Sequence, residues 1–225
     1  MRAAWSLGCI SCRWTIRIGR WHAGTSRSTW TRGFDSTSAR CASRGQVERR
    51  PSTVIEHEFA PEAMLAVLNE HGVRLVLVGG FAAVIHGSPY VTTDIDIVPE
   101  RSEANLERLS SALAALHARV WTSAEPEGHP FGHDAASLRR VNVWNLVTDH
   151  GRLDITFVPS GTSGYEDLAR DARRLVILGV EVDVASLSDV VRSKEAAGRE
   201  KDRLVLPVLR RILDESGRRD GHPEK

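Results

Sequence analysis

The sequence predicts an α/β (α+β) protein with a mixed β-sheet that is flanked by helices and followed by C-terminal helices. From residue 54 onward, short apolar runs rich in β-branched residues alternate with longer segments whose leucines recur at helical spacing. The predicted order is three helix–strand alternations, then four further strands, then two helices, and this order is typical of a mixed sheet.

The first half of this region holds three helices and two strands. Pro61 is tolerated in a first helical turn, and Gly72 ends that helix. The apolar run over 73–78 is ended by the Gly79-Gly80 pair. The run Asp94-Ile95-Asp96-Ile97 alternates polar and apolar residues as a strand does. The predicted elements are a helix over 61–71, a strand over 73–78, a short helix over 81–86, a strand over 94–98 and a helix over 103–118.

The second half is richer in strands. A turn around residues 149–151 predicts a hairpin, Gly179 separates another strand pair, and Ser186 or Ser188 caps the helix that follows. Pro207 is expected to bend the last helix. The predicted elements are a strand edge over 120–122, a loop over 124–137, strands over 141–147 and 152–158, a short helix over 166–171, strands over 175–178 and 180–184, and helices over 188–197 and 199–215.

Residues 1–53 differ from the rest of the chain. They hold ten arginines, no lysine and two acidic residues, a net charge of +8, while the remainder carries −7. We favour a disordered basic extension, which could arise from a start codon assigned too far upstream. The alternatives are a targeting peptide and an arm that binds nucleic acid. Cys9 and Cys12 have the spacing of a zinc knuckle, but no second pair follows them. The domain is expected over 54–218, with a disordered tail over 219–225.

The positions of the cysteines and the hydropathy of the sequence indicate the cellular compartment in which the chain is expected. No segment approaches the ~20 apolar residues of a membrane span. Beyond Cys41 there is no cysteine, so the domain needs no disulfide and suits a reducing compartment. We therefore expect a cytoplasmic protein with no membrane partner.

Two aspartates form the centre of the predicted site. Asp94 and Asp96 lie two apart on one strand, so both carboxylates emerge from the same face of the sheet. Like charges at this distance repel, and a shared hard cation such as Mg²⁺ removes the repulsion with oxygen ligands. The pair therefore predicts a divalent-cation site on a rigid element.

A glycine pair precedes this strand. Gly79 and Gly80 stand between a strand and a helix, where backbone N–H groups can approach a phosphate and the helix N-terminus adds partial positive charge. Thirteen residues separate Gly80 from Asp94, enough for a short helix and a return to a neighbouring strand. A phosphate cradle and a metal site could then face one nucleoside triphosphate (NTP).

Together, Val78-Gly79-Gly80, the thirteen-residue spacing and Asp94-Ile95-Asp96-Ile97 resemble the signature of the DNA polymerase β-like nucleotidyltransferase superfamily. Leu77 to Ala83, His86-Gly87 and Thr92-Thr93-Asp94-Ile95-Asp96 look like the bacterial minimal nucleotidyltransferases of toxin–antitoxin and abortive-infection systems. The resemblance implies a nucleotidyltransferase fold and a third carboxylate, for which Asp154 is the best match. It assigns the metal and the catalysis to Asp94, Asp96 and Asp154, and the nucleotide to Gly79, Gly80, Thr92, Thr93 and Lys194.

The same resemblance implies two Mg²⁺ ions, with Mn²⁺ as an alternative, and transfer of NMP from an NTP to a hydroxyl. The acceptor is left open between tRNA, a partner protein and a small molecule, and a cognate toxin or antitoxin is an expected partner. Near Lys194, the charged residues Arg199, Lys201 and Asp202 are weaker candidates, since solvated charges on a helix explain them equally well.

The chain departs from the family at one position. These families often carry an arginine two residues before the threonine of the Thr-x-Asp-x-Asp run, and Tyr90 stands there instead. Tyrosine can stack on a base or donate a hydrogen bond, but it supplies no charge. The alternative prediction is therefore a catalytically weak antitoxin or binding module that acts by protein contact.

Overall fold

The computed structural model describes residues 59–220, and its side chains as far as residue 218. The predictions for residues 1–53, including the basic arm and the Cys9/Cys12 pair, lie outside the described residues, as does most of the predicted tail. Within the described range, no helix has both the length and the apolar character needed to cross a membrane.

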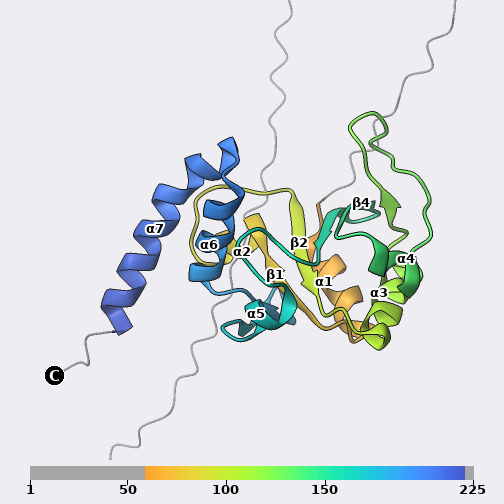
Figure 1. Cartoon of the computed structure of the whole chain (residues 1–225), viewed down its shortest axis with the longest axis horizontal. Helices are drawn as coiled ribbons and strands as arrows, with labels where there is room; N and C mark the ends of the chain where they lie inside the picture. Colours follow the sequence, from red (N-terminus) through yellow and green to blue (C-terminus); the bar gives the residue numbers. More distant parts are fainter. Residues whose placement is uncertain (1–58, 221–225) are drawn as a thin grey trace, which may run out of the picture. The chain divides into compact units, whose positions relative to one another are not determined.

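A seven-stranded mixed sheet forms the centre of the domain, in the order β3-β4-β5-β2-β1-β7-β6 (Figure 1). Most of its strands follow the predicted apolar runs to within one or two residues. The strands are β1 (Leu75–Val78), β2 (Asp94–Pro99), β3 (Arg119–Val120), β4 (Val143–Thr148), β5 (Gly151–Thr156), β6 (Arg173–Ile177) and β7 (Val180–Val184).

The strand β2 is bonded on both sides near the middle of the sheet. It runs antiparallel to β1 and parallel to β5, and this parallel register sets Asp96 directly beside Asp154. The predicted hairpin joins β4 to β5, with Asn145 opposite Asp154. Both edges of the sheet are antiparallel pairs, β3 with β4 and β6 with β7.

Helices flank the sheet, so the predicted mixed sheet with C-terminal helices is confirmed. The two C-terminal helices, α6 and α7, lie side by side (Figure 1). The helices are α1 (Pro61–Glu70), α2 (Gly79–Ile85), α3 (Glu103–Ala115), α4 (Ala135–Arg140), α5 (Tyr165–Ala169), α6 (Leu187–Ala197) and α7 (Glu200–Asp220).

The core gives the sheet two unlike faces. Ile95 and Ile97 of β2 are fully buried in the cluster that also holds the leucines of α1 and α3. Each buried aliphatic side chain contributes about 1.5–3 kcal/mol, so this face fixes the register of β2. The alternate residues, Asp94 and Asp96, therefore have to point to the opposite face.

Local hydrogen bonds explain where α3 begins and how it is held against the sheet. Ser102 accepts a hydrogen bond from the backbone N–H of Asn105 and caps α3. The amide of Asn105 is buried, accepts from the N–H of Arg74 at 2.7 Å and donates to the carbonyls of Arg74 and Glu100 at 2.9 Å. It thereby ties α3 to the loop before β1 and to the end of β2.

Three predicted elements need correction. The loop prediction for 124–137 was wrong at its end, because Asp134 caps α4 by accepting from the N–H of Ser137 at 3.0 Å. The helix α2 begins at Gly79 itself, not at Phe81. The last helix passes through Pro207 and continues to Asp220, beyond the predicted end at residue 215.

Candidate active site

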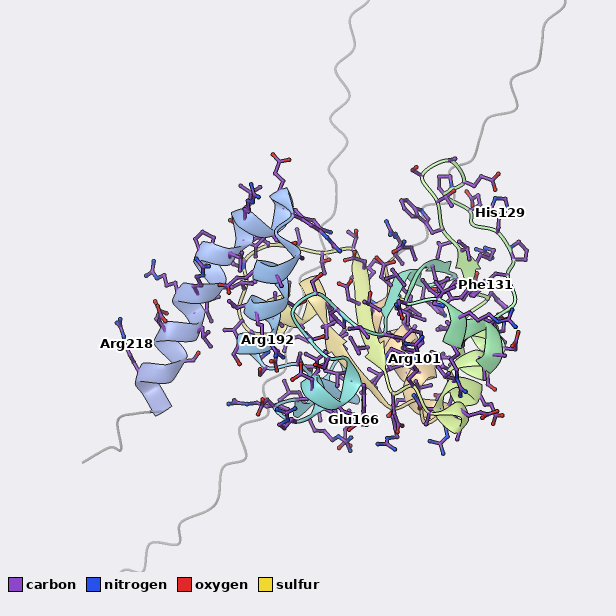
Figure 2. The ribbon with its side chains drawn as sticks, viewed as in Figure 1. Arg101, His129, Phe131, Glu166, Arg192 and Arg218 are labelled. Atoms are coloured by element: carbon purple, nitrogen blue, oxygen red, sulfur yellow. The ribbon has the colours of Figure 1, made fainter. Side chains whose placement is uncertain are left out.

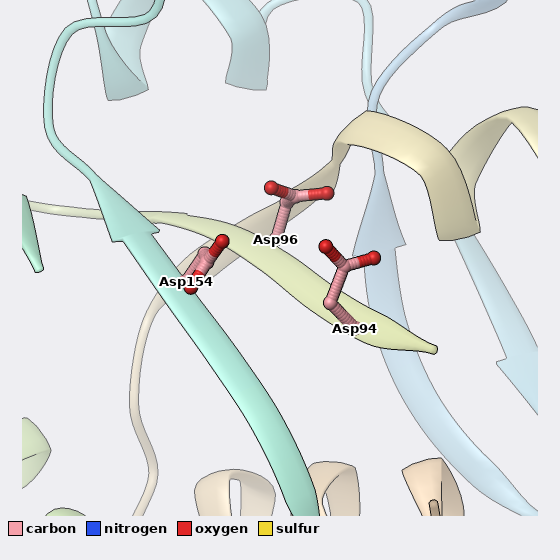
Figure 3. A group of neighbouring side chains, drawn as sticks. All are labelled: Asp94, Asp96 and Asp154. Atoms are coloured by element: carbon pink, nitrogen blue, oxygen red, sulfur yellow. The ribbon is translucent and has the colours of Figure 1, made fainter. Parts of the chain in front are cut away.

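Three carboxylates meet on the face of the central strands that is opposite the core. Asp94 and Asp96 project from β2 and Asp154 from the adjacent β5, all toward the same side (Figure 3). One oxygen from each lies within 4.8 Å of those of the other two. The structure thus brings together the three aspartates that the sequence predicts, because two of them alternate with buried isoleucines and the third is their register partner.

The cluster is electrostatically strained. Burial raises the pKa of Asp96 to about 6, with added repulsion from Asp94 and Asp154, against the opposing effects of the Gly80 N–H and of Lys194. Burial also raises the pKa of Asp154, although the Arg152 guanidinium opposes that rise. Positive charge placed among these oxygens would relieve the repulsion.

The donor set fits a hard divalent cation. All three candidate ligands are carboxylates, the ligands that Mg²⁺ and Mn²⁺ take together with phosphate oxygens. No histidine or cysteine belongs to this cluster among residues 59–220, so a thiolate or imidazole metal site is not indicated.

Gly79 allows α2 to start directly against the carboxylates. Its φ is +67°, and a Cβ at this position would lie 1.9 Å from Oδ2 of Asp96. The backbone N–H of Gly80 donates to the same oxygen at 3.2 Å. The first turn of α2 therefore lies against Asp96. The backbone N–H of Gly80 was predicted to face a phosphate, but in this structure it donates to a carboxylate of the candidate metal site.

The two threonines before β2 differ in their surroundings. Thr92 donates a hydrogen bond from its hydroxyl to Asp94 and lines the cavity beside the carboxylates. A Cβ on Gly80 would come within 2.8 Å of the Thr92 Oγ1, so the second glycine also makes room for this contact. Thr93 is exposed and is not among the residues that line the cavity.

A cavity of about 530 Å³ opens above the carboxylates. This volume lies within the range of small-molecule sites. Its walls come from α2, the loop after α2, β2, β4, β5, the loop after β5, α6 and the first turn of α7. Segments far apart in the sequence therefore complete one site.

Cationic groups form the C-terminal side of the cavity. Lys194 of α6 lies deep, with 16% of its side chain exposed, and its Nζ is 3.1 Å from Oδ1 of Asp202. Arg199 and Lys201 line the cavity and are exposed. Lys194 and Lys201 act on the pKa values of Asp96 and Asp154 respectively, so both charges lie within electrostatic range of the carboxylates.

Apolar side chains form part of the rim. Tyr90, Val91 and Leu204 line the cavity with exposed fractions of 45%, 95% and 68%. The hydroxyl of Tyr90 donates to the carbonyl of Leu204 at 3.5 Å and so joins the loop after α2 to the first turn of α7. Tyr90 thus stands at the mouth of the cavity, where the resembled families often have a charge.

Two residues gain importance from the structure. Asn145 is exposed, lines the cavity and lies opposite Asp154, so a polar residue facing the carboxylate across the predicted hairpin could have been noted from the pattern alone. Asp202 was only a weak candidate, yet its side chain is 4% exposed and pairs with Lys194. Nothing in the sequence could distinguish this buried aspartate from its solvated neighbours.

Comparison with known proteins gives a general likeness only. No family model and no curated protein sequence matches the chain. A Thermotoga maritima protein assigned as a nucleotidyltransferase is 19% identical, with 71% of this chain and 98% of that chain covered and a TM-score of 0.43. The antibiotic-resistance factor ANT(2″)-Ia is 14% identical, with coverages of 72% and 96% and a TM-score of 0.37. Likeness at this level does not transfer a function, which has to be derived from the cavity.

Proposed function

We propose that this protein is a divalent-cation-dependent nucleotidyltransferase that moves NMP from an NTP to a hydroxyl group. The observation that carries the proposal is the cluster of Asp94, Asp96 and Asp154 beneath a cavity whose other side holds Lys194, Arg199 and Lys201. Carboxylates that hold a metal and cations that hold phosphate are the two halves of a triphosphate site.

In the proposed reaction, the acceptor oxygen attacks the α-phosphorus of the NTP in line with the leaving group. The bond from this phosphorus to the bridging oxygen breaks, and pyrophosphate leaves with the electron pair. The hydroxyl proton passes to a carboxylate oxygen of Asp154, which acts as the general base. Asp94, Asp96 and Asp154 would hold Mg²⁺ or Mn²⁺, which supplies charge neutralisation for the attacking and leaving oxygens.

Other residues of the cavity would bind the phosphates or orient the carboxylates. Lys194, oriented by Asp202, lies on the side of the cavity where the β- and γ-phosphates would bind. Arg199 and Lys201 add positive charge at the mouth of the cavity. Because both side chains are exposed to solvent, they can remain in contact with pyrophosphate as it leaves. Thr92 holds the Asp94 carboxylate in place through its hydrogen bond.

The wider setting belongs to the same proposal. The motif resemblance favours a cytoplasmic toxin–antitoxin or abortive-infection system, with tRNA or a partner protein as the acceptor and a cognate toxin or antitoxin as the partner. The sequence around Gly79 and Asp94 supports this setting.

The test is a transfer assay with each α-labelled NTP, Mg²⁺ or Mn²⁺, total tRNA and candidate proteins. Wild type should label one acceptor class and release pyrophosphate, while Asp94→Ala combined with Asp96→Ala should do neither and should lose metal-dependent NTP binding. Asp171→Asn, an exposed aspartate outside the cavity, serves as the matched control. Unchanged NTP binding in the double variant would refute the site.

A second candidate function is a binding module that neutralises a partner by contact. The uncharged Tyr90 at the rim, next to exposed Val91 and Leu204, favours it because this mouth is partly apolar. If Asp94→Ala still protects cells from the product of a neighbouring toxin gene, contact and not catalysis is the function. Loss of protection in Asp94→Ala with the partner still bound would support the enzyme.

A further inference from the structure

The carboxylate face of the sheet continues past Asp154 toward the β3 edge. Strand register sets Asn145 of β4 beside Asp154, and the backbone N–H of Trp121, just after β3, donates to the carbonyl of Asn145 at 2.8 Å. Asp96, Asp154, Asn145 and Trp121 therefore lie in one row, which runs from β2 across β5 and β4 to the residue that follows β3. Lys194, Arg199 and Lys201 line another side of the cavity and do not belong to this row.

Arg152 bridges this row. It precedes Asp154 by two residues on β5, so both side chains leave the same face of the strand. Its Cζ lies 3.8 Å from the centroid of the Trp121 ring, which is a close cation–π stack. Its Nη2 lies 3.5 Å from Oδ1 of Asp154, a long contact for a hydrogen bond.

The guanidinium is oriented but has few hydrogen bonds. Its Nε is buried and has no hydrogen-bond partner among the described residues, so the stack on the Trp121 ring and the long ion pair with Asp154 hold the group there. The side chain is 32% exposed, and it lies outside the lining of the cavity but next to Asp154, which lines it. A planar, pre-oriented guanidinium is the protein group best suited to bind a phosphate through two parallel hydrogen bonds.

The charge of Arg152 itself favours an anionic group at this place. In the segment that follows β3, the acid Glu125 is paired with His129, which Figure 2 shows near Phe131. Arg152 would repel a cationic acceptor, because its charge lies within a few ångströms of the place that the acceptor hydroxyl has to reach beside Asp154. A polynucleotide end, in contrast, brings a phosphodiester close to its terminal hydroxyl.

We propose that Arg152, held by Trp121 and flanked by Asn145, is the binding group for a phosphate of the acceptor, next to the hydroxyl that receives the nucleotide. The acceptor is thus a phosphorylated molecule, an RNA 3′ end or a phosphorylated metabolite, and not a protein hydroxyl or a polycationic small molecule. This inference rests on the proposed function, because it takes Asp154 to mark the acceptor side.

The experiment measures binding of two probes without any transfer step. The full-length protein is titrated with a labelled single-stranded RNA of about twelve nucleotides and with a nucleoside monophosphate, at several salt concentrations. Arg152→Gln is compared with Arg211→Gln, an arginine of α7 that is 81% exposed and pairs with Glu215 of its own helix instead of with the carboxylate cluster. Both variants keep residues 1–58 and lose one charge, so any contribution of the basic arm cancels.

Arg152→Gln should weaken binding of at least one probe about tenfold and reduce the magnitude of the RNA salt slope by about 0.7, while Arg152→Lys should recover only part of the affinity. An effect on RNA alone identifies a nucleic-acid acceptor, and an effect on the monophosphate alone identifies a small phosphorylated one. Equal binding by Arg152→Gln and Arg211→Gln overturns the inference, as does unchanged labelling of a protein or polycationic acceptor by Arg152→Gln. Metal-dependent NTP binding, measured in parallel, should stay intact in Arg152→Gln and reports separately on the proposed function.

Discussion

The ammonium of Lys194 lies 3.1 Å from the carboxylate of Asp202, and this ion pair joins α6 to the first turn of α7 beside the carboxylate cluster. Both side chains are mostly buried, with 16% and 4% exposed. A flexible lysine is thereby fixed as a point charge facing the cavity. Asp202 is a positioning residue in this arrangement, because it acts on a ligand only through Lys194.

Asp202→Ala should leave the Lys194 ammonium without its partner and lower the free energy of unfolding by about 3 kcal/mol. The double variant Lys194→Met with Asp202→Leu should regain most of that loss, since a buried ion pair can be replaced by apolar groups of similar size. Urea unfolding measures stability, and NTP titration measures the site. If the double variant recovers stability and also binds NTP normally, Lys194 is only structural.

Gly79→Ala should abolish metal binding as well as lower stability. A methyl group would overlap Oδ2 of Asp96 at 1.9 Å, and the φ of +67° adds about 1–2 kcal/mol of backbone strain. Gly72→Ala is the matched control, because its φ is +64° and a Cβ there meets nothing within 4 Å. The control should show the strain alone, with Mg²⁺ or Mn²⁺ affinity unchanged. Equal behaviour of the two variants in calorimetric titration would contradict the close packing of α2 on Asp96.

The metal-free protein should lose stability as pH rises. Asp96 has a pKa of about 6 in the folded state, above its ordinary value of 3.8, so its protonation stabilises the fold fully below pH 3.8 and this contribution is lost as pH passes 6. Asp154 shifts in the same direction. Asp96→Asn should therefore be more stable than wild type at pH 7.5, by on the order of 1–3 kcal/mol without metal.

Protons and divalent cations should compete for this cluster. The rise in Tm that Mg²⁺ produces in wild type should grow between pH 5 and pH 7.5, and Asp96→Asn should show little rise at either pH. Differential scanning calorimetry with and without Mg²⁺ measures both. An Mg²⁺ effect of equal size at both pH values would argue against carboxylate binding.

Asp154→Asn should separate transfer from substrate binding. The amide cannot accept the acceptor proton, so kcat should fall by at least about 100-fold. NTP affinity should change less than about threefold, since Asp94, Asp96 and Lys194 remain. Equilibrium NTP binding and single-turnover transfer, with Asp171→Asn as control, give the two numbers. A loss of affinity as large as the loss in rate would place Asp154 in nucleotide binding instead.

The sequence predicts the central parts of this site because their cause is local. Alternation in Asp94-Ile95-Asp96-Ile97 fixes which side chains face out once the isoleucines are buried. Asp154 was assigned from the family resemblance, and its place beside Asp96 comes from the long-range parallel pairing of β2 with β5. The structure adds what depends on register and packing. That Gly79 touches Asp96, or that Arg152 stacks on Trp121, follows from the meeting of distant segments, which no local pattern encodes.

Errors in the prediction have equally physical reasons. Residues 124–137 have the glycines and prolines of a loop, and one capping aspartate, Asp134, was enough to start α4 inside that range. Pro207 was expected to bend the last helix and its end was set at residue 215, whereas α7 runs through Pro207 to Asp220. Helix caps and prolines are single-residue signals, and their effect depends on the tertiary packing around them.

The position of the carboxylates on β2 and β5 has a practical consequence for redesign. Both strands are hydrogen-bonded on two sides within the sheet, whereas Trp121 lies at the β3 edge, next to a long connecting segment. Substitutions and insertions at that edge can change what enters beside Arg152 without moving the metal ligands. If the proposed function holds, the metal ligands lie on other strands than the segment beside which the acceptor would enter, and directed evolution of new acceptors should concentrate on residues 121–134.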